Sequence, residues 1–372
     1  MSGDAPRILV SAGEPSGDLH GAEVIAALRA RLPGVRIDAV GGPRMVGAGG
    51  TLLFPMERLS AMGAVEIVGR LPAHVGLYRR LSAGFRRRDW DLFLPIDYPG
   101  FHVRVVRAAR RAGVPVLYYI PPQLWAWRPG RARALAAAVD RLAVVLPFEP
   151  AFFAAAGLPA TYVGHPLLDR PAAPTREAAR RALGIGSDAR VLAIFPGSRE
   201  QEVRSHWAIF RAAAERLRAE GRCDEIVVAT TAAGRYPDPG AARLCPDSRL
   251  VLAAADACLA KSGTTTLEAA LADVPMAVAY RMHPLSFALA RRLVTVEWVS
   301  LVNLIADREV VPELLQERLT VPGLVGALGP LLVAGSPERQ AQLAGLAEVR
   351  RRLGAPGASA RVAALAAELL AA

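Results

Sequence analysis

Short apolar runs alternate with alanine-rich amphipathic stretches along most of the chain. Runs of this length that are rich in Val, Ile and Leu are typical of buried strands, and the stretches between them have helical spacing. In the first half the pattern predicts strands at 8–11, 35–41, 91–96, 116–120, 141–146 and 161–163, and helices at 18–31 and 102–112. Strands and helices that alternate at this spacing indicate a parallel, doubly wound sheet.

The same alternation starts again in the second half of the chain. It predicts strands at 191–195, 225–230, 257–260 and 276–280, and two helices that end near 219 and 272. The proline-rich stretch 170–175 between the halves is the best linker candidate. We therefore expect two α/β domains, 1–170 and 171–372, and a last alanine-rich helix, 358–371, that can pack on either domain.

Glycine-containing loops connect strands to helices in both halves. The first loop contains Glu14, Ser16, Gly17 and Asp18, and the loops of the second half contain Gly197, Ser198 and Arg199, and Ser262, Gly263 and Thr264. A helix N-terminus offers unpaired N–H groups and a positive dipole end, which suit a phosphate. An ordinary tight turn explains the first loop, or the loop of Ser262, Gly263 and Thr264, equally well. In doubly wound domains ligands bind at the carboxyl ends of the strands, so we expect a site in a cleft between the domains.

Two polar side chains near these loops have clear chemical uses. Arg199 lies where a helix begins, and its planar fork can hold a diphosphate. Asp97 follows a strand and can act as a general base on a hydroxyl. Each also has a structural interpretation: Arg199 as a solvated residue at a helix start, and Asp97 as the first residue of a turn before Tyr-Pro-Gly.

Other candidates are less specific. Glu268 can accept both hydroxyls of a ribose, or it can simply complement the dipole of its helix. Asp18 can cap the first helix. Gln123 and Trp125 follow a strand in the segment 121–127, whose tryptophans can line a pocket or pack in the core.

Charge and composition narrow the class of protein. The chain of 372 residues is 52% hydrophobic and has a net charge of +11. Between Arg70 and Arg141 there are fourteen arginines and four acids, an excess of +10 that attracts phosphate on nucleic acid or on an anionic membrane. Lys261 is the only lysine, so a compositional bias explains arginine over lysine but does not explain the clustering.

Compartment and metal use also follow from the sequence. The chain has no predicted leader or membrane span, and its three cysteines have no CxxC spacing, so we expect a cytoplasmic protein. The six histidines are scattered, without the spacing of metal ligands. Asp89 and Asp91 match the DxD pattern of metal-dependent sugar transferases, but they precede a strand inside an arginine run. We therefore expect no metal and no other cofactor.

Ten segments, in this order, resemble the lipid-A-disaccharide synthases. They are SAGEPSGDLHGA, GGPRM, MGAVEIVGRLP, PIDYPGFH, PPQLWAWRPGR, YVGHPLLD, FPGSREQEV, KSGTTTLEAAL, YRMHPLSF and VSLVNLIADREVVPELLQ. The resemblance covers nearly the whole chain. It implies an α/β GT-B fold, with two Rossmann-like domains that face a central cleft and a last helix that can cross back.

The resemblance also implies an activity and a location. Enzymes of this family join UDP-2,3-diacylglucosamine to 2,3-diacylglucosamine 1-phosphate in a β(1→6) linkage and release UDP. They work without a metal, as peripheral proteins on the cytoplasmic face of the inner membrane. The family is not a nucleic-acid binder, and the sequence leaves open whether this chain forms a homo-oligomer.

Residue roles carried over from the family complete this picture. Asp97 is implied as the base for the acceptor hydroxyl, and Arg199 with Gly197 and Ser198 as the diphosphate site. Ser262, Gly263, Thr264, Glu268 and Asn303 are implied for the rest of UDP. Glu14, Ser16, Gly17 and Asp18 are implied for the cleft floor, and Gln123 and Trp125 are candidates for the acceptor side.

Some features leave alternatives open. Val302 and Asp307 depart from the Pro and Gly that are usual in the family. The segment 62–77 can hold acyl chains, enter the membrane interface or form an ordinary core helix. A UDP-N-acetylglucosamine 2-epimerase or another UDP-sugar glycosyltransferase of the same fold is the nearest alternative function. A nucleic-acid-binding protein that uses the 70–141 arginines is a third, and it leaves the glycine loops unexplained.

Overall fold

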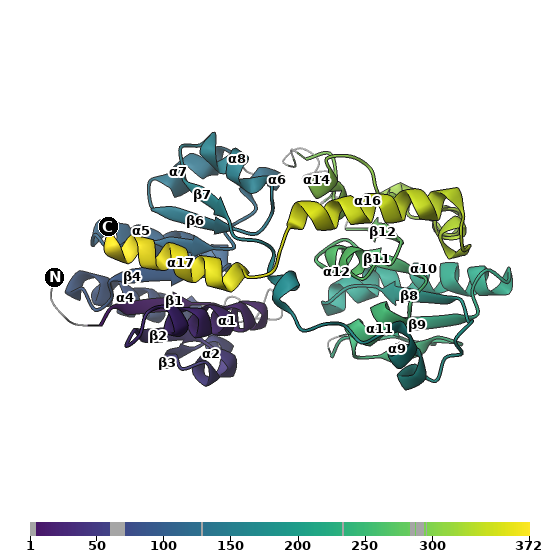
Figure 1. The fold of residues 1–372 in the computed structure, drawn as a ribbon, viewed down its shortest axis with the longest axis horizontal. Coiled ribbons are helices and arrows are strands. Elements are labelled where there is room, and N and C mark those ends of the chain that lie inside the picture. Colours follow the sequence, from purple (N-terminus) through teal and green to yellow (C-terminus); the bar gives the residue numbers. More distant parts are fainter. Residues whose placement is uncertain are drawn as a thin grey trace. The chain divides into compact units, whose positions relative to one another are not determined.

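The chain folds into two compact units (Figure 1). The computed structural model describes residues 5–59, 71–127, 129–232, 234–282, 287, 294 and 296–372. The first unit comprises Met1–Arg170 and Ala355–Ala372, and the second comprises Pro171–Gly354. The division after Arg170 lies at the start of the proline-rich stretch. The C-terminal end differs from the expected second domain of 171–372, because residues 355–372 belong to the first unit.

The first unit is built on parallel strands whose order changes direction beside β1. The strands are β1 (Arg7–Ser11), β2 (Arg36–Gly41), β3 (Thr51–Pro55), β4 (Leu92–Pro95), β5 (Leu117–Tyr119), β6 (Arg141–Val144) and β7 (Ala160–Tyr162). Two sheets, β3-β2-β1-β4 and β5-β6-β7, are joined through the bridges Phe93↔Val116 and Ile96↔Tyr119. Strands β4 and β5 are buried along their whole length, and β1 is buried except for Arg7, which explains their apolar sequences.

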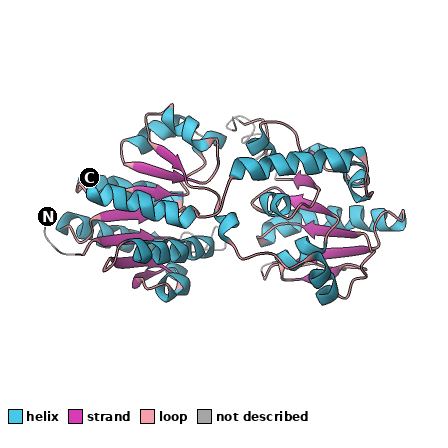
Figure 2. Cartoon of the chain, viewed as in Figure 1, coloured by secondary structure: helices cyan, strands magenta, loops and turns pink. Residues whose placement is uncertain are grey.

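Helices cover both faces of this sheet (Figure 2). They are α1 (Pro15–Arg31), α2 (Pro43–Gly47), α4 (Leu71–Arg87), α5 (Pro99–Arg111), α6 (Leu124–Trp127), α7 (Ala132–Ala136), α8 (Glu149–Ala154) and α17 (Ala358–Ala371), with a 3₁₀ turn, η2, at Pro129–Arg131. On one face, Leu9 and Phe93 pack in a core cluster with residues of α4 and α5. On the other face, α17 packs along α1.

The last helix belongs to the first unit for physical reasons. Its alanine-rich sequence favours a helix, and Val362, Leu365 and Ala366 are buried. Arg361 Nε donates to the carbonyl of Val163 at 2.7 Å. These contacts hold α17 on the first unit after the chain has passed through the second.

The second unit contains a six-stranded parallel sheet in the order β10-β9-β8-β11-β12-β13. The strands are β8 (Val191–Phe195), β9 (Glu225–Ala229), β10 (Arg243–Cys245), β11 (Ala257–Lys261), β12 (Met276–Tyr280) and β13 (Glu313–Leu315). The helices are α9 (Arg176–Leu183), α10 (Glu200–Ala219), α11 (Ser248–Ala254), α12 (Thr265–Leu271), α14 (Leu301–Ala306), α15 (Val321–Leu328) and α16 (Pro337–Leu353). Leu192 and Ile194 of β8 pack on Phe210 of α10 and Leu324 of α15.

Within the described parts of the chain, no helix is both long and apolar enough to cross a bilayer.

Candidate active site

In each unit, two of the predicted loops follow neighbouring strands at the point where the strand order reverses. In the first unit, β1 pairs with β4, so the loop after β1 and the turn at Asp97 are adjacent. In the second unit, β8 pairs with β11, so the loops 196–199 and 262–264 are adjacent. Open α/β sheets bind ligands at such switch points. The strand order thus brings together, within each unit, the loops that the sequence singled out.

Asp97 lies in a left-handed turn just after β4. Its φ is +48° and that of Tyr98 is +53°, a conformation that costs an L-residue about 1–2 kcal/mol. The Asp97 carbonyl accepts hydrogen bonds from His102 Nδ1 at 2.6 Å and from the Tyr118 hydroxyl at 2.9 Å. These two bonds stabilise the strained turn and fix the direction in which the Asp97 side chain leaves the backbone.

His102, which supports this turn, is a neutral ring. Complete burial lowers its pKa to about 4. A carbonyl can only accept, so Nδ1 carries the proton and Nε2 accepts from the Ser11 hydroxyl at 2.8 Å. Ser11 is the last residue of β1, so His102 links the ends of the two strands at the switch point.

The Asp97 carboxyl is half-buried and close to the first loop. Burial raises its pKa, and the negative charge of Glu14 raises that pKa further. The first loop contacts the turn closely at Gly13, because a Cβ added at Gly13 would lie only 2.4 Å from the Tyr98 ring. A carboxylate with a raised pKa is a better proton acceptor than one in water, which suits a general base.

The other predicted residues of the first loop have different environments. Glu14 and Ser16 are exposed at the start of α1, and Gly17 is buried. The interpretation of Asp18 as a cap of its own helix is wrong, because α1 begins at Pro15. The buried Asp18 carboxylate instead accepts from three backbone amides at the start of α2: Gly42 at 2.7 Å, Arg44 at 3.1 Å and Met45 at 3.2 Å. Asp18 therefore connects the first turn of α1 to the start of α2, beside the first loop.

Trp125 packs in the core and does not present its ring to a ligand. It is buried, donates from Nε1 to Glu149 at 3.0 Å and meets Phe148 edge-on. Glu149 also accepts from the amides of Val145 and Leu146, and burial raises its pKa to about 7. Gln123 is exposed beside α6. Trp127 is the exposed tryptophan of this segment, with 45% of its surface accessible.

In the second unit, the loop after β8 is held by a glutamate of the following helix. Gly197 has φ +136°, and a Cβ there would lie 2.4 Å from the Glu202 Cβ, so only glycine fits. Glu202 Oε2 accepts from the amides of Ser198 at 2.9 Å and Arg199 at 3.4 Å. The Arg199 side chain is exposed and has no hydrogen bond or ion pair to any described residue.

Glu202 also connects this loop to the loop after β11. Its Oε1 accepts from Lys261 Nζ at 2.8 Å, and both side chains are less than one-fifth exposed. Lys261 Nζ lies 5.4 Å from the centre of the Tyr280 ring, and the His206 ring stacks on Tyr280 with the ring centres 6.0 Å apart. The sequence reasoning did not select Glu202, Lys261 or His206. Two signals were present: a glutamate three residues after Arg199, as in a capping box, and the only lysine of the chain.

The loop after β11 leads into α12. The Ser262 hydroxyl donates to the Val299 carbonyl at 2.8 Å, so it anchors the segment that precedes α14. Gly263 is half-buried, and Thr264 is exposed just before the first residue of α12. Glu268 is half-buried in the first turn of that helix.

Asn303 is placed differently from its predicted role as a direct contact to UDP. It is fully buried, and its amide makes four hydrogen bonds within the unit. Nδ2 donates to the Val311 carbonyl and to Glu313, both at 2.9 Å, and Oδ1 accepts from the amides of Val310 and Val311. These bonds use all the capacity of a side-chain amide. Asn303 therefore positions the start of α14, together with the buried Glu313.

The two departures from the family pattern are structurally accommodated. Val302 is fully buried in α14. Asp307 follows the last residue of that helix with φ +55°, the left-handed conformation in which glycine usually ends a helix. Aspartate tolerates this conformation better than most residues do.

Asp89 and Asp91 lie away from the switch point of the first unit. They precede β4, so they are at the amino end of the strand and Asp97 is at its carboxyl end. Asp89 accepts from Arg87, and Asp91 accepts from the Arg7 amide at 2.8 Å. Across the described ranges, no group of three His, Cys, Asp or Glu side chains is arranged to hold a metal ion.

Comparisons with known proteins agree with this arrangement. The sequence family described as Lipid-A-disaccharide synthetase matches residues 8–353. The chain is 40% identical to the lipid-A-disaccharide synthase of Myxococcus xanthus and covers 98% of each protein. It is 44% identical to that of Rhodospirillum centenum, over 93% of this chain and 90% of the relative.

Solved structures show the fold. MurG of Acinetobacter baumannii has a TM-score of 0.60 at 15% identity, and the glycosyltransferase of kitacinnamycin has 0.64 at 18%; each comparison covers 98% of this chain and 99% of the other. A UDP-GlcNAc 2-epimerase of Neisseria meningitidis has a TM-score of 0.60 at 10% identity. The chain therefore has the α/β GT-B fold, with two Rossmann-like units. From the sequence matches, it belongs to the lipid-A-disaccharide synthase family of glycosyltransferases.

Proposed function

We propose that the protein transfers a 2,3-diacylglucosaminyl group from UDP to the 6-hydroxyl of 2,3-diacylglucosamine 1-phosphate (lipid X). The products are the β(1→6)-linked disaccharide 1-phosphate and UDP. The observation that carries the proposal is the Asp97 carboxyl of raised pKa at a switch point, in a chain whose family is established.

In this proposal Asp97 is the general base. Its carboxylate takes the proton of the acceptor hydroxyl while that oxygen attacks the anomeric carbon of the donor. The bond between the anomeric carbon and the diphosphate oxygen breaks, and UDP leaves with the electron pair. Attack on the face opposite the leaving group inverts the anomeric centre. The strained turn held by His102 and Tyr118 supports this role, because it fixes the position of the carboxyl.

The second unit is the proposed donor site. Arg199, with the loop of Gly197 and Ser198, binds the diphosphate, and its exposed guanidinium with no partner among the described residues supports this role. Ser262, Gly263, Thr264 and Glu268 contact the rest of UDP at the start of α12. The partly buried Glu202–Lys261 pair links the loop after β8 to the end of β11, so the two loops keep their positions relative to each other.

The first unit is the proposed membrane-facing part, located on the cytoplasmic side of the inner membrane. Residues 62–70 of the expected lipid-facing segment lie outside the described residues. Residues 71–77 form the first turns of α4, where Leu71 is 60% and Val75 is 41% exposed while Leu77 is buried. Arg79, Arg80, Arg86 and Arg87 on the same helix are exposed. Exposed apolar residues next to arginines suit an anionic lipid surface.

An assay of UDP release tests the proposed function. Release from UDP-2,3-diacylglucosamine is expected only when 2,3-diacylglucosamine 1-phosphate is also present. Release without the acceptor contradicts a transferase and indicates a hydrolase. Conversion of UDP-N-acetylglucosamine to its 2-epimer, without any transfer, supports the alternative function.

A further inference from the structure

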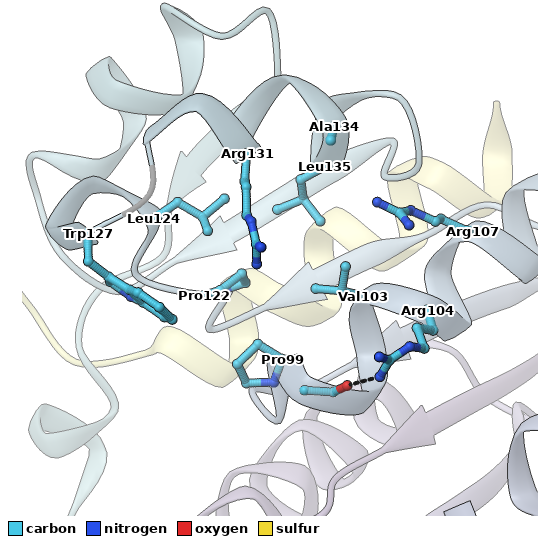
Figure 3. Close-up of a pocket in the computed structure, with 11 residues that line it drawn as sticks. Pro99, Val103, Arg104, Arg107, Pro122, Leu124, Trp127, Arg131, Ala134 and Leu135 are labelled. Atoms are coloured by element: carbon cyan, nitrogen blue, oxygen red, sulfur yellow. Dashed lines mark hydrogen bonds between the residues drawn. The ribbon is translucent and has the colours of Figure 1, made fainter. Parts of the chain in front are cut away.

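A pocket of about 570 Å³ lies in the first unit between α5 and the short helices α6 and α7 (Figure 3). This volume is within the usual range for small-molecule sites, about 300–1,000 Å³. The wall is largely apolar: Val103 comes from α5, Leu124 from α6 and Leu135 from α7. None of the residues proposed above for the base or the donor lines this pocket. Its function is therefore not explained by those sites.

Three arginines surround the apolar wall. Arg104 and Arg107 project from α5 and Arg131 comes from η2, and no carboxylate is among the described lining residues. Arg104 donates to the Gly100 carbonyl at 2.9 Å, whereas Arg107 and Arg131 have no hydrogen bond or ion pair to any described residue. In Figure 3 the Arg131 side chain extends between Leu124 and Leu135. The pocket thus combines an apolar wall with positive charge.

The surrounding sequence offers no acid to neutralise this charge. Between Asp97 and Asp140 the chain contains no acidic residue. Asp140 is already bound by Arg110 at 2.7 Å and by the Val116 amide at 2.8 Å. A ligand that completes this pocket must therefore carry its own negative charge, together with an apolar part that covers the wall.

The pocket is also adjacent in sequence to the proposed base. Pro99 and Gly100 line it, and they follow Asp97 by two and three residues. The opposite wall is anchored from behind, because Trp125 of α6 donates to the buried Glu149 at 3.0 Å. The pocket is therefore built on elements whose positions are fixed by buried contacts.

We infer that this pocket binds the phosphate and an acyl chain of an acylated sugar phosphate, the acceptor of the proposed reaction. The inference rests on the proposed function and deepens it. Arg107 and Arg131 hold the phosphate, Arg104 adds positive charge at the rim, and the wall of Val103, Leu124 and Leu135 covers the acyl chain. The acceptor hydroxyl then lies on the Asp97 side of the pocket.

Calorimetry with a defined probe tests the inference. The probe is 2,3-diacylglucosamine 1-phosphate with short acyl chains, and its phosphate-free form is the comparison ligand. We expect Arg107→Ala and Arg131→Ala each to lower affinity for the probe about 10–100-fold, as for loss of a charge-assisted hydrogen bond. Neither variant should change affinity for the phosphate-free form or for UDP.

Matched controls are available on the same elements. Arg111 on α5 and Arg133 on α7 are exposed and do not line the pocket. Arg111→Ala and Arg133→Ala should therefore bind the probe within about twofold of wild type. The apolar part is tested by Ala134→Trp, which fills the pocket and should weaken both acylated ligands. Ala137→Trp, at an exposed position outside the pocket, should not.

Each outcome separates the inference from the proposed function. If wild type binds and consumes the probe but the pocket variants match their controls, the pocket inference is wrong and the proposed function stands. If wild type binds no acylated sugar phosphate, both are wrong. If Arg107→Ala and Arg131→Ala retain probe affinity but lose binding to phosphatidylglycerol vesicles, the pocket is a phospholipid headgroup site, which overturns the inference.

Discussion

Replacing His102 with asparagine probes the support beneath the proposed base. The asparagine amide can still donate to the Asp97 carbonyl, as Nδ1 does at 2.6 Å in the wild type, but the variant loses the titrating ring and its bond to Ser11. We expect the turnover number to fall by up to about tenfold, since one neutral hydrogen bond contributes roughly 0.5–1.5 kcal/mol. Affinity for UDP should not change, because the His102 contacts lie in the first unit.

The effect of pH on stability follows from the pKa of His102. Burial lowers this pKa from 6.5 to about 4, so the folded state binds fewer protons than the unfolded state. The stability that the neutral ring contributes is therefore fully present above pH 6.5 and is lost as the pH falls toward 4. Between pH 7.5 and pH 4.5 this loss comes to about 2.5 kcal/mol.

Urea denaturation of wild type and His102→Asn at both pH values measures this loss. His165 and Glu149 also titrate with shifted pKa values, but they are present in both proteins and their effects cancel in the difference. We expect the advantage of the wild type over the variant to shrink by about 2.5 kcal/mol on acidification. A difference that stays constant, or that grows at pH 4.5, contradicts a neutral buried ring and hence the hydrogen-bond roles given to His102.

Four other predictions concern the base, the donor site, metal use and the membrane. Asp97→Asn should lower transfer about 10²–10⁴-fold without changing UDP affinity. The same substitution should raise the melting temperature at pH 7.5, because the raised pKa of Asp97 makes its charged form unfavourable in the folded state. Asparagine also tolerates the left-handed turn. If Asp97→Asn keeps near wild-type turnover, the base lies elsewhere. Arg199→Ala should weaken UDP binding by roughly 1.5–3 kcal/mol in calorimetry, whereas Arg204→Ala, an exposed arginine on the following helix α10, should not. Equal UDP affinities of the wild type and Arg199→Ala argue against the diphosphate role. Chelation with EDTA should leave the rate unchanged, and a loss of activity that magnesium restores returns attention to Asp89 and Asp91. The double variant Leu71→Ser and Val75→Ser should float less with anionic vesicles at high salt. High salt screens the contribution of the arginines, which is on the order of 1 kcal/mol each at low salt, so the apolar contact decides the result. If the double variant floats like the wild type, the lipid contact lies elsewhere.

Much of the fold was predictable because the strands of parallel sheets are short, buried and apolar. Strand β8, for example, is found at the predicted residues 191–195 and the last helix at 358–371. The three-residue strands β10 and β13 were not predicted, because each begins with a charged residue and contains only two apolar residues. The attachment of 355–372 to the first unit depends on contacts such as Arg361 to Val163, which no local pattern reports.

In the candidate site, too, features set by local sequence were predictable, and features set by residues distant in sequence were not. The position of Asp97 at a strand end was predictable, because the strand is a clear apolar run. Its left-handed conformation was not, since it depends on Tyr118 and on the buried His102. Asp18, Trp125 and Asn303 were selected as ligand contacts, but their hydrogen-bond partners lie 7 to 27 residues away in sequence. The Glu202–Lys261 pair spans 59 residues, and only the fold reveals it.

Product analysis tests the central claim most directly. Purified protein is incubated with UDP-2,3-diacylglucosamine and 2,3-diacylglucosamine 1-phosphate in the presence of EDTA, and the products are identified by mass spectrometry and NMR. We predict equal amounts of UDP and of a disaccharide 1-phosphate whose new linkage is β(1→6), and no disaccharide from Asp97→Asn. UDP without a disaccharide, an α linkage, or full activity of Asp97→Asn would contradict the account.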